Sequence, residues 1–405
     1  MLSPLALTQA LPFLPLAQGD IDYRSDLRAH DGIIAQLLAD PSTTVMLVRG
    51  GRIAVPKGQG VLAERETARM RRATLPGAYL ADELAAHPQA VAMMLGAYGA
   101  AAGAGGGTGA CIARDAGVDH DEDDHGMDSG IVVGSGAYVI AIDLTRVNER
   151  PADADAQAAL AVVPDAAGTG ADDAFDEYDG RSAVPVSAVR PSILEQAIRR
   201  FDWVDLRGFA PHASAREAGQ ATTAVTLSIW HNRQRYCPTC GAPVESAMAG
   251  WAQRCTNDED GRRLLFPRVE PAVISAIVDR DDRLLLQHNA AWSDPRLYSV
   301  SAGFVEAGEN LEHAVRREAR EETGLTLGEV RYLGSQPWPF PASLMMAFKA
   351  LALDTDIRVD GEETLQARWV TRDEYTAELV SGRMVAPGKA TIARYMIEEW
   401  YGREI

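Results

Sequence analysis

Three glutamates, Glu318, Glu321 and Glu322, are the residues of this sequence best suited to metal chemistry. They lie in the run RREAREETGL, which predicts that a helix ends at Thr323-Gly324, because glycine commonly follows the last helical turn. Buried without a partner, each carboxylate would cost on the order of several kcal/mol. A cation must therefore compensate them, and so acidic a cluster suits hard divalent ions such as Mg²⁺ or Mn²⁺.

The predicted helix also carries an apolar stripe that the glutamates continue. Residues three and four apart share a helical face. Leu311 and Val315 therefore define an apolar stripe, and Glu318 and Glu322 fall on it one and two turns later, with Glu321 beside them. A solvated surface helix rich in Glu and Arg is the alternative interpretation, and carboxylates on an inward-facing stripe argue against it.

The spacing of the surrounding residues resembles the Nudix box, the signature of the Nudix hydrolase superfamily. Gly303 is followed after five residues by Glu309 and, after seven more, by the run Arg317-Glu318-Ala319-Arg320-Glu321-Glu322-Thr323-Gly324-Leu325. This long pattern is far more specific than a helix rich in Glu and Arg. The resemblance implies hydrolysis of a pyrophosphate linkage with the help of divalent ions.

The resemblance also implies a role for each residue of the box. Glu318 and Glu322 are expected to be metal ligands. Glu321 is expected to be either a ligand or the base that deprotonates water, and the sequence does not separate the two roles. Arg317 is expected to orient a glutamate through a bidentate pair, which lysine would do poorly. Glu309 is expected to brace the loop.

A proline-rich, aromatic segment, Ser335-Gln-Pro-Trp-Pro-Phe-Pro-Ala-Ser343, follows the box. The simpler interpretation is an edge loop that packs on the core. The segment nevertheless closely resembles the signature of NAD(H) diphosphatases, the NADH pyrophosphatase branch of the Nudix superfamily, and the likeness covers about residues 185–405. It implies a dinucleotide site lined by Gln336, Pro337, Trp338, Pro339, Phe340, Pro341, Ala342 and Ser343.

The same branch implies further site residues. Phe304 is expected to stack on the nicotinamide ring, with Phe266 facing it. Glu363 resembles an additional metal-binding glutamate, the carbonyl of Ala302 is expected to reach a metal, and Ala393 resembles a substrate-contacting position. The resemblance further implies two or three Mg²⁺ or Mn²⁺ ions in each site, and a homodimer whose sites draw on both chains.

Three of the four cysteines form a pattern typical of a zinc ribbon. Cys237 and Cys240 make a Cys-x-x-Cys turn, and Cys255 follows after fourteen residues. Asp258 stands where a four-cysteine ribbon has its last ligand, so Asp258 is the predicted fourth ligand, with Asp260 as the alternative. We expect a structural Zn²⁺ that stabilises a small module; a degenerate site without zinc is the other interpretation.

Composition restricts the class of protein. The net charge of −18 opposes non-specific binding to nucleic acid or an anionic membrane, and no apolar run approaches the length that spans a membrane. Clustered cysteines fit a metal site in a reducing compartment better than a disulfide framework, so a cytoplasmic location is predicted. The apolar first twenty residues lack a basic region and contain three prolines, which disfavours a signal peptide.

The chain is predicted to have three parts. An N-terminal α/β domain covers residues 1–230, with flexible low-complexity insertions near 98–130 and 151–183. A zinc-ribbon-like module covers 231–265, and a Nudix hydrolase domain covers 266–405. The fold class is α/β with α+β character, and the Nudix part is an α/β/α sandwich around a mixed sheet. Hairpins are predicted at 43–55 and 271–289, strands at 329–338, 343–353 and 363–370, and helices at 216–237 and 391–401.

These patterns predict an enzyme that splits NADH or NAD⁺ into nicotinamide mononucleotide and AMP. Removal of an NAD cap from RNA uses the same bond and site, and ADP-ribose is an alternative substrate. A nucleotide sensor with an inactive Nudix fold is a non-enzymatic alternative, against which the intact set of glutamates argues. A zinc-ribbon nucleic-acid module is another, against which the few basic residues around the cysteines (Arg233, Arg235 and Arg254) argue.

Overall fold

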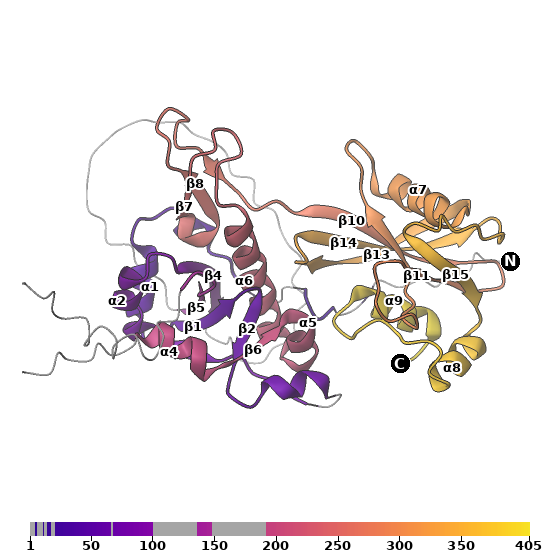
Figure 1. The fold of residues 1–405 in the computed structure, drawn as a ribbon, viewed down its shortest axis with the longest axis horizontal. Coiled ribbons are helices and arrows are strands. Elements are labelled where there is room, and N and C mark those ends of the chain that lie inside the picture. The colour runs from indigo at the N-terminus through magenta and orange to yellow at the C-terminus, as the bar shows by residue number, and fades with distance from the viewer. Residues whose placement is uncertain are drawn as a thin grey trace, which may run out of the picture.

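The computed structural model describes residues 5, 11, 14–17, 21–65, 68–99, 136–147 and 192–405. Except for residues 98 and 99, the insertion predicted near 98–130 lies outside the described residues, and so does the insertion near 151–183. The described residues form two lobes, each built on its own six-stranded sheet, and a small three-stranded sheet packs on the first lobe (Figure 1). This mixed α/β architecture confirms the predicted fold class.

The N-terminal lobe is built on a mixed sheet with the strand order β4-β5-β1-β2-β6, and β3 pairs with β1. β1 and β5 are parallel, whereas the other pairs are antiparallel. Its strands are β1 (Thr44–Arg49), β2 (Arg52–Val55), β3 (Thr74–Pro76), β4 (Val91–Gly99), β5 (Gly136–Asp143) and β6 (Asp202–Asp205). Its α-helices are α1 (Ile33–Ala39), α2 (Ala81–Ala86), α4 (Ile193–Arg200), α5 (Leu206–Phe209) and α6 (Ala215–Arg233).

The hairpin predicted at 43–55 is confirmed, because β1 and β2 pair in antiparallel register across Gly50-Gly51. Both glycines have positive φ values, +56° and +72°, which a two-residue hairpin turn requires and which side chains disfavour. The turn therefore brings the end of β1 and the start of β2 together beside α6, where a Cβ atom added to Gly51 would lie 3.6 Å from the Ile229 side chain.

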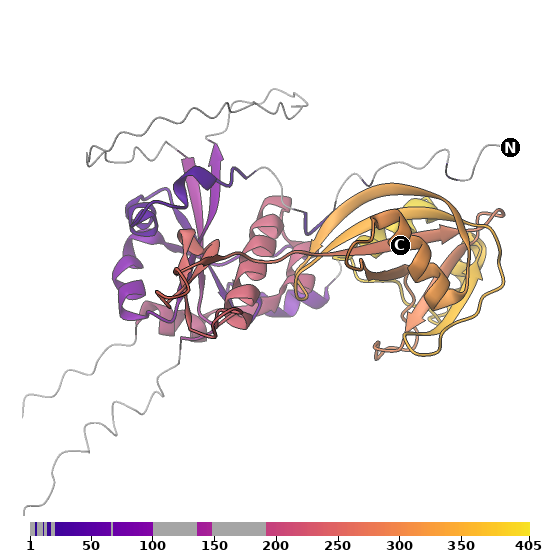
Figure 2. The ribbon, with the colours of Figure 1, turned by 90° about the horizontal axis from the view of Figure 1, so that it is seen from above.

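The long helix α6 covers one face of this sheet. The hydroxyl of Ser214 caps its first turn by accepting a hydrogen bond from the Glu217 N–H. Ala218, Ala221 and Val225 are buried against the sheet, as the apolar spacing of the sequence predicts. In Figures 1 and 2, α6 stands on the side of the N-terminal lobe that faces the C-terminal lobe.

A three-stranded antiparallel sheet follows α6. It consists of β7 (Val244–Ala247), β8 (Ala252–Cys255) and β9 (Leu264–Leu265), in that order. The chain then leaves β9 and enters the C-terminal lobe through β10, as both ribbon views show. Single-turn 3-10 helices occur at Ser25–Leu27, Gly60–Glu64, Gly77–Tyr79, Ala210–His212 and Met248–Gly250.

The C-terminal lobe has a mixed sheet of order β13-β14-β10-β11-β15, with β12 paired to β10. β10 and β14 are parallel, and the remaining neighbours are antiparallel. The strands are β10 (Glu270–Val278), β11 (Leu284–Asn289), β12 (Ser301–Phe304), β13 (Leu327–Trp338), β14 (Ser343–Ala352) and β15 (Thr364–Val370). The helices are α7 (Leu311–Thr323), α8 (Arg372–Val380) and α9 (Ile392–Tyr401).

Helices cover both faces of this second sheet, which gives the predicted α/β/α sandwich. Side chains alternate along β10, because successive residues of a strand point to opposite faces. Val273 and Ile277 pack with α7, whereas Ile274 packs in a separate cluster that includes Trp400 of α9. The strands predicted at 329–338, 343–353 and 363–370, the hairpin at 271–289 and the helix at 391–401 are all confirmed.

Several features of the C-terminal lobe were not predicted from the sequence. β12 and α8 belong to this lobe, and neither was predicted. Leu5 and Leu14 are buried in the cluster that contains α9, and the Leu5 carbonyl accepts a hydrogen bond from Arg331. Leu5 and Leu14 therefore pack into the C-terminal lobe, whereas Leu16 packs in the N-terminal lobe. Among the described residues, the helices are too short or too polar to cross a membrane.

Candidate active site and candidate zinc site

The helix that carries the glutamates is fixed at both ends by its own sequence. The Asn310 side chain caps the first turn by accepting a hydrogen bond from the His313 N–H. Gly324 ends the helix in the left-handed conformation, at φ +75°. Val315, Glu318 and Glu322 are all buried along one side of α7. The apolar stripe thus continues into the two carboxylates, as the spacing predicts.

Gly303 of β12 allows α7 to lie close to the sheet. A Cβ atom at this position would lie 2.0 Å from the Glu318 Cδ, a distance that no pair of non-bonded atoms tolerates. The absence of a side chain at Gly303 therefore makes room for the Glu318 carboxylate. This close approach is the physical reason for a glycine at the start of the pattern.

Arg317 is the hub of the site. Its Nε and Nη2 donate to the two oxygens of Glu309, at 3.0 and 2.9 Å. Its Nη1 donates to Glu318 Oε1 at 2.9 Å and to Glu321 Oε2 at 2.8 Å. Nη2 also donates to the Phe304 carbonyl at 2.8 Å. The bidentate pair is the interaction predicted for Arg317, and its partner is Glu309.

Glu309 anchors the loop that precedes α7. In addition to Arg317, its carboxylate accepts the Glu306 N–H at 3.0 Å and contacts the His313 ring. The Arg317 guanidinium lowers the pKa of Glu309 to about 2. Glu309 is therefore ionised at neutral pH and already committed to partners inside the protein, which suits a bracing role.

The negative charges of Glu318 and Glu322 are less well compensated than that of Glu309. The Ser301 hydroxyl and the Gln287 amide donate to Glu322 at 2.6 and 3.3 Å. Burial nevertheless raises the pKa of Glu322 to about 7, and burial also raises the pKa of Glu318 above its usual value. Two buried carboxylates that resist ionisation alone are a donor set that a bound cation would stabilise.

These groups open into a cavity of about 590 Å³. Six carboxylates line it, against the single guanidinium of Arg317. Glu363 is among them, and its backbone N–H donates to Asp360 Oδ2 at 3.3 Å, which ties the Glu363 loop to a second lining carboxylate. Ala302 also lines this cavity. The structure therefore brings together Glu318, Glu321, Glu322, Glu363 and Ala302, and this oxygen-rich donor set fits hard divalent ions.

An aromatic wall borders the same cavity. Phe304, Trp338 and Phe340 line it together with Ser343, and the Phe304 side chain is 55% exposed. Trp338 and Phe340 contact each other edge to face, with centroids 4.9 Å apart. The cavity therefore combines a carboxylate cluster with flat rings.

The other residues of the proline segment lie around this wall. Gln336 is fully buried and donates to the Ala390 carbonyl at 3.0 Å. Pro337 is paired with Leu344 within the sheet. Three further residues line neighbouring cavities and not the carboxylate cavity, namely Pro339, Pro341 and Ala342. The segment thus separates several cavities, and only part of it faces the glutamates.

Phe266 and Ala393 lie outside the carboxylate cavity. Phe266 is 60% exposed and lines a separate cavity with Trp230 and Pro341. Within one chain it is therefore not brought to Phe304. Ala393 lines a cavity of about 530 Å³ that shares Ala302 and Trp338 with the carboxylate cavity, so these two spaces adjoin.

The three cysteines of the small sheet converge as predicted, and the fourth group beside them is Asp260. The ligand atoms of Cys237, Cys240, Cys255 and Asp260 all lie within 4.8 Å of one another. Cys237 Sγ is 3.3 Å from Asp260 Oδ2, and Cys240 Sγ is 3.5 Å from Cys255 Sγ. Zn–S bonds of about 2.3 Å in a tetrahedron imply edges of roughly 3.8 Å, so the four donors fit Zn²⁺.

The prediction of Asp258 as the fourth ligand requires correction. Asp258 is not part of this group; its side chain is 86% exposed and lies 3.6 Å from Arg262. The turn after Cys255 instead directs Asp260 toward the sulfurs, and Arg263 holds the Asp260 carboxylate with two hydrogen bonds, at 2.8 and 2.5 Å. The ligand spacing of a four-cysteine ribbon therefore does not transfer to this turn.

Sequence reasoning missed Gln287, Ser301 and Asp360. Each lies in a segment distant from α7 and reaches the site only through the sheet or through the loop before β15. A polar residue inside an apolar strand, such as Gln287 in LLLQHN, is the one signal in the sequence that could have indicated them.

Comparison with known proteins gives domain matches for both sites. Residues 268–393 match the NUDIX domain, and residues 232–259 match the NADH pyrophosphatase zinc ribbon domain. The protein named NAD-capped RNA hydrolase NudC from Mycobacterium bovis (strain BCG / Pasteur 1173P2) is 44% identical over 206 residues, which cover 49% of this chain and 64% of that protein. The protein of the same name from Mycobacterium tuberculosis (strain ATCC 25618 / H37Rv) is 43% identical over equal shares.

A human protein is also similar. NAD-capped RNA hydrolase NUDT12 from Homo sapiens is 37% identical over 193 residues, 46% of this chain and 42% of that protein. The chain therefore covers less than two thirds of the length of each of these three relatives. A crystal structure of a NUDIX hydrolase from Nitrosomonas europaea aligns at 22% identity and a TM-score of 0.32, over 42% of this chain and 94% of that one.

The close approach at Gly303 predicts that Gly303→Ala weakens binding of a divalent ion. The added methyl group would displace the Glu318 carboxylate, so we expect the affinity for Mn²⁺ to fall about 10- to 100-fold, as for other disturbed ligand supports. Electron paramagnetic resonance of free Mn²⁺ measures this affinity. Gly328→Ala is the matched control, because its methyl group would meet the exposed side chain of Leu353 and, at ordinary contact distance, the Leu351 carbonyl, and neither belongs to the carboxylate cavity. Equal affinity in both variants would contradict the role given to Gly303.

The position of Asp260 predicts which aspartate holds zinc. We expect Asp260→Ala to lower the zinc content of the purified protein well below one ion per chain, and Asp258→Ala to leave it at the wild-type level. Elemental analysis by mass spectrometry measures the zinc-to-protein ratio. The two variants remove the same charge from the same turn, so the comparison isolates the ligand. Zinc loss in Asp258→Ala alone would restore the ligand assignment made from the sequence.

Proposed function

We propose that the protein hydrolyses the pyrophosphate bond of NADH or NAD⁺, because residues 268–393 match the NUDIX domain and residues 232–259 match the NADH pyrophosphatase zinc ribbon domain. The products are nicotinamide mononucleotide and AMP. One observation carries the proposal, namely that the carboxylate cluster and the aromatic residues Phe304, Trp338 and Phe340 line one cavity. A dinucleotide carries the matching groups, because its pyrophosphate needs cations and its bases are flat rings.

The proposed metal ligands are Glu318, Glu321, Glu322, Glu363 and the Ala302 carbonyl, which would hold two or three Mg²⁺ or Mn²⁺ ions. When bound, these ions neutralise the phosphate oxygens and promote attack by water. Glu321 is the most exposed of the three helical glutamates, since its side chain retains 59% of its accessible surface. It is thus either a further ligand or the group that accepts a proton from the attacking water.

The protein's own residues supply positioning. Arg317 holds Glu318 and Glu321 in place and ties both to Glu309 and to the Phe304 carbonyl. The backbone of Phe304 is therefore tied to the group that orders the carboxylates. In this proposal the nicotinamide stacks on Phe304 and the pyrophosphate lies over Glu318 and Glu322, so a single hydrogen-bonded unit aligns the substrate with the metal ligands.

A homodimer is part of the proposal. The branch that the sequence resembles places a second aromatic ring opposite Phe304, and Phe266 is the residue at the matching position. Phe266 is exposed and lines another cavity of its own chain. A partner copy that brings its own Phe266 to Phe304 would complete the stacking site, which supports assembly from two chains.

An NAD cap on RNA is the second candidate substrate. It contains the same pyrophosphate, and the similar proteins from Mycobacterium and Homo sapiens are named NAD-capped RNA hydrolases. ADP-ribose is a third candidate, because it shares the adenosine diphosphate part but lacks the nicotinamide ring.

Product analysis by mass spectrometry tests the proposed reaction. The full-length protein is incubated with Mg²⁺ or Mn²⁺ and with NADH, NAD⁺, ADP-ribose, FAD or a dinucleoside polyphosphate. We expect preferential conversion of NADH or NAD⁺ into AMP and nicotinamide mononucleotide, and a loss of most turnover in Glu322→Gln. Preference for ADP-ribose would support pyrophosphate hydrolysis but reject NADH or NAD⁺ as the substrate. Absence of any product would favour the alternative of a nucleotide sensor with an inactive Nudix fold.

The stacking role of Phe304 gives a separate prediction. We expect Phe304→Ala to raise KM for NADH about tenfold, in line with the 1–3 kcal/mol that base stacking on an aromatic contributes, and to change KM for ADP-ribose much less. Tyr332→Ala is the control, because Tyr332 is a comparably exposed aromatic residue of the same lobe that does not line the cavity. Equal changes for both substrates would contradict the proposed nicotinamide contact.

A further inference from the structure

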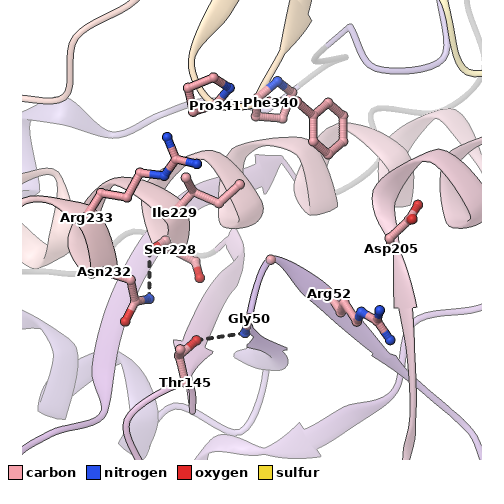
Figure 3. A pocket seen from close by; sticks show the side chains of 12 residues that line it. Gly50, Arg52, Thr145, Asp205, Ser228, Ile229, Asn232, Arg233, Phe340 and Pro341 are labelled. Carbon is pink, nitrogen blue, oxygen red and sulfur yellow. Dashed lines mark hydrogen bonds between the residues drawn. The ribbon is translucent and has the colours of Figure 1, made fainter. Parts of the chain in front are cut away.

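A cavity of about 560 Å³ lies between the two lobes, apart from the metal ligands (Figure 3). The Gly50-Gly51 turn, the last turns of α6 and the β6 end supply its N-terminal side. Phe340 and Pro341 of the proline segment supply its C-terminal side. Neither the proposed metal site nor the proposed nicotinamide contact uses this space.

Two arginines line this cavity without being neutralised. Arg52 is the first residue of β2, Arg233 is the last residue of α6, and both are exposed. In Figure 3 they lie on opposite sides of the cavity. Within the described part of the chain, neither arginine side chain forms a hydrogen bond or an ion pair. Asp205 is the one carboxylate that lines the cavity; it lies opposite Arg52 in the register of β2 and β6, and it caps α5 by accepting the Gly208 N–H.

The polar wall between the two arginines is rigid. Asp143 is buried and accepts hydrogen bonds from the Ser228 hydroxyl at 3.0 Å, from the Asn232 amide and from Thr145. Thr145 in turn accepts the Gly50 N–H at 2.8 Å. This network fixes the end of α6 to the β1–β2 turn. It therefore holds the backbones that carry Arg233 and Arg52 at a set separation.

The cavity adjoins the proposed catalytic cavity. Phe340 lines both of them. Arg207 of α5 stacks on Phe340 at 4.0 Å and lines the third cavity, which contains Ala393. Three arginines thus line two cavities, each of which shares residues with the proposed catalytic cavity.

This concentration of positive charge contrasts with the rest of the molecule. The chain carries a net charge of −18, and the carboxylate cavity itself is strongly acidic. Free arginines beside hydrogen-bonding side chains are suited to bind phosphate oxygens. A dinucleotide that occupies the metal site has only its pyrophosphate, which the metal ligands serve. A ligand therefore needs additional phosphates if it is to contact Arg52 and Arg233 as well.

We propose that the cavity between the lobes binds the phosphodiester backbone of an RNA strand whose NAD cap occupies the catalytic cavity. This inference rests on the proposed function with capped RNA as the substrate, and it names the residues that would contact the RNA strand beyond the cap. The strand leaves the cap at the adenosine ribose and passes Phe340, and its first phosphates meet Arg52 and Arg233. RNA carries one negative charge per nucleotide, so these contacts strengthen binding to RNA and leave free NADH unaffected.

Kinetics with two substrates test this inference. The double variant Arg52→Gln/Arg233→Gln is compared with wild type, using NADH and a short 5′ NAD-capped oligoribonucleotide at several KCl concentrations. We expect kcat/KM for the capped RNA to fall about tenfold through KM, and kcat/KM for NADH to change less than about twofold. The slope of log(kcat/KM) against log[KCl] for the RNA should become shallower by about 1.4, since each phosphate contact to a single strand contributes about 0.7.

Arg199→Gln/Arg200→Gln is the matched control. It makes the same change in net charge, on the exposed side of α4, away from the cavity. An equal loss on RNA in the control variant, or an equal loss on both substrates in the cavity variant, would overturn the inference. If the wild-type protein cleaves neither substrate, the proposed function fails. Fluorescence anisotropy of the labelled RNA then tests RNA binding without cleavage. Equal RNA affinity of the wild type and the cavity variant would reject the RNA site.

Discussion

The Arg317 guanidinium is the interaction on which the candidate active site depends. It joins the β12 carbonyl of Phe304, the loop carboxylate of Glu309 and two carboxylates of α7. Hydrogen bonds to charged groups contribute about 1.5–3 kcal/mol each. A guanidinium cannot lose its charge at any ordinary pH, so this junction persists whether or not a cation is bound. Three segments of the chain are thereby fixed relative to one another before any ligand arrives.

One guanidinium cannot neutralise the whole cluster. Six carboxylates line the cavity, and the bidentate contact of Arg317 is made with Glu309. Burial raises the pKa of Glu322, the most buried member, to about 7, and its side-chain partners among the described residues are a neutral hydroxyl and a neutral amide. The site is thus rigid around Arg317 and Glu309. The negative charges of Glu318 and Glu322, by contrast, are only partly compensated. This combination distinguishes a candidate metal site from a structural ion-pair network.

The sequence predicted those features that local spacing determines. Helical periodicity placed Glu318 and Glu322 on the buried face of α7, and the alternating apolar runs predicted β10, β11, β13, β14 and β15. Features that depend on the path of a turn or on distant segments were not predictable in this way. Asp258 and Asp260 are equally acceptable donors in the sequence, and only the turn after Cys255 selects Asp260. Gln287, Ser301 and Asp360 reach the glutamates through strand pairing and loop packing, which spacing along the chain does not report.

The cavity between the lobes is a further feature that spacing along the chain does not predict. In the sequence, Arg233 belongs to a sparse set of basic residues near the cysteines, too few to indicate a nucleic-acid surface. The fold adds Arg52 of β2, which is distant in the sequence, to the same cavity, and it places Arg207 over the Phe340 ring. A net charge averages over the whole chain and does not report such local groupings. The charge of −18 therefore excludes a uniformly basic surface but does not exclude a local phosphate site. Because the proline segment forms one wall of both cavities, a ligand bound to the arginines would also contact the residues that border the metal ligands.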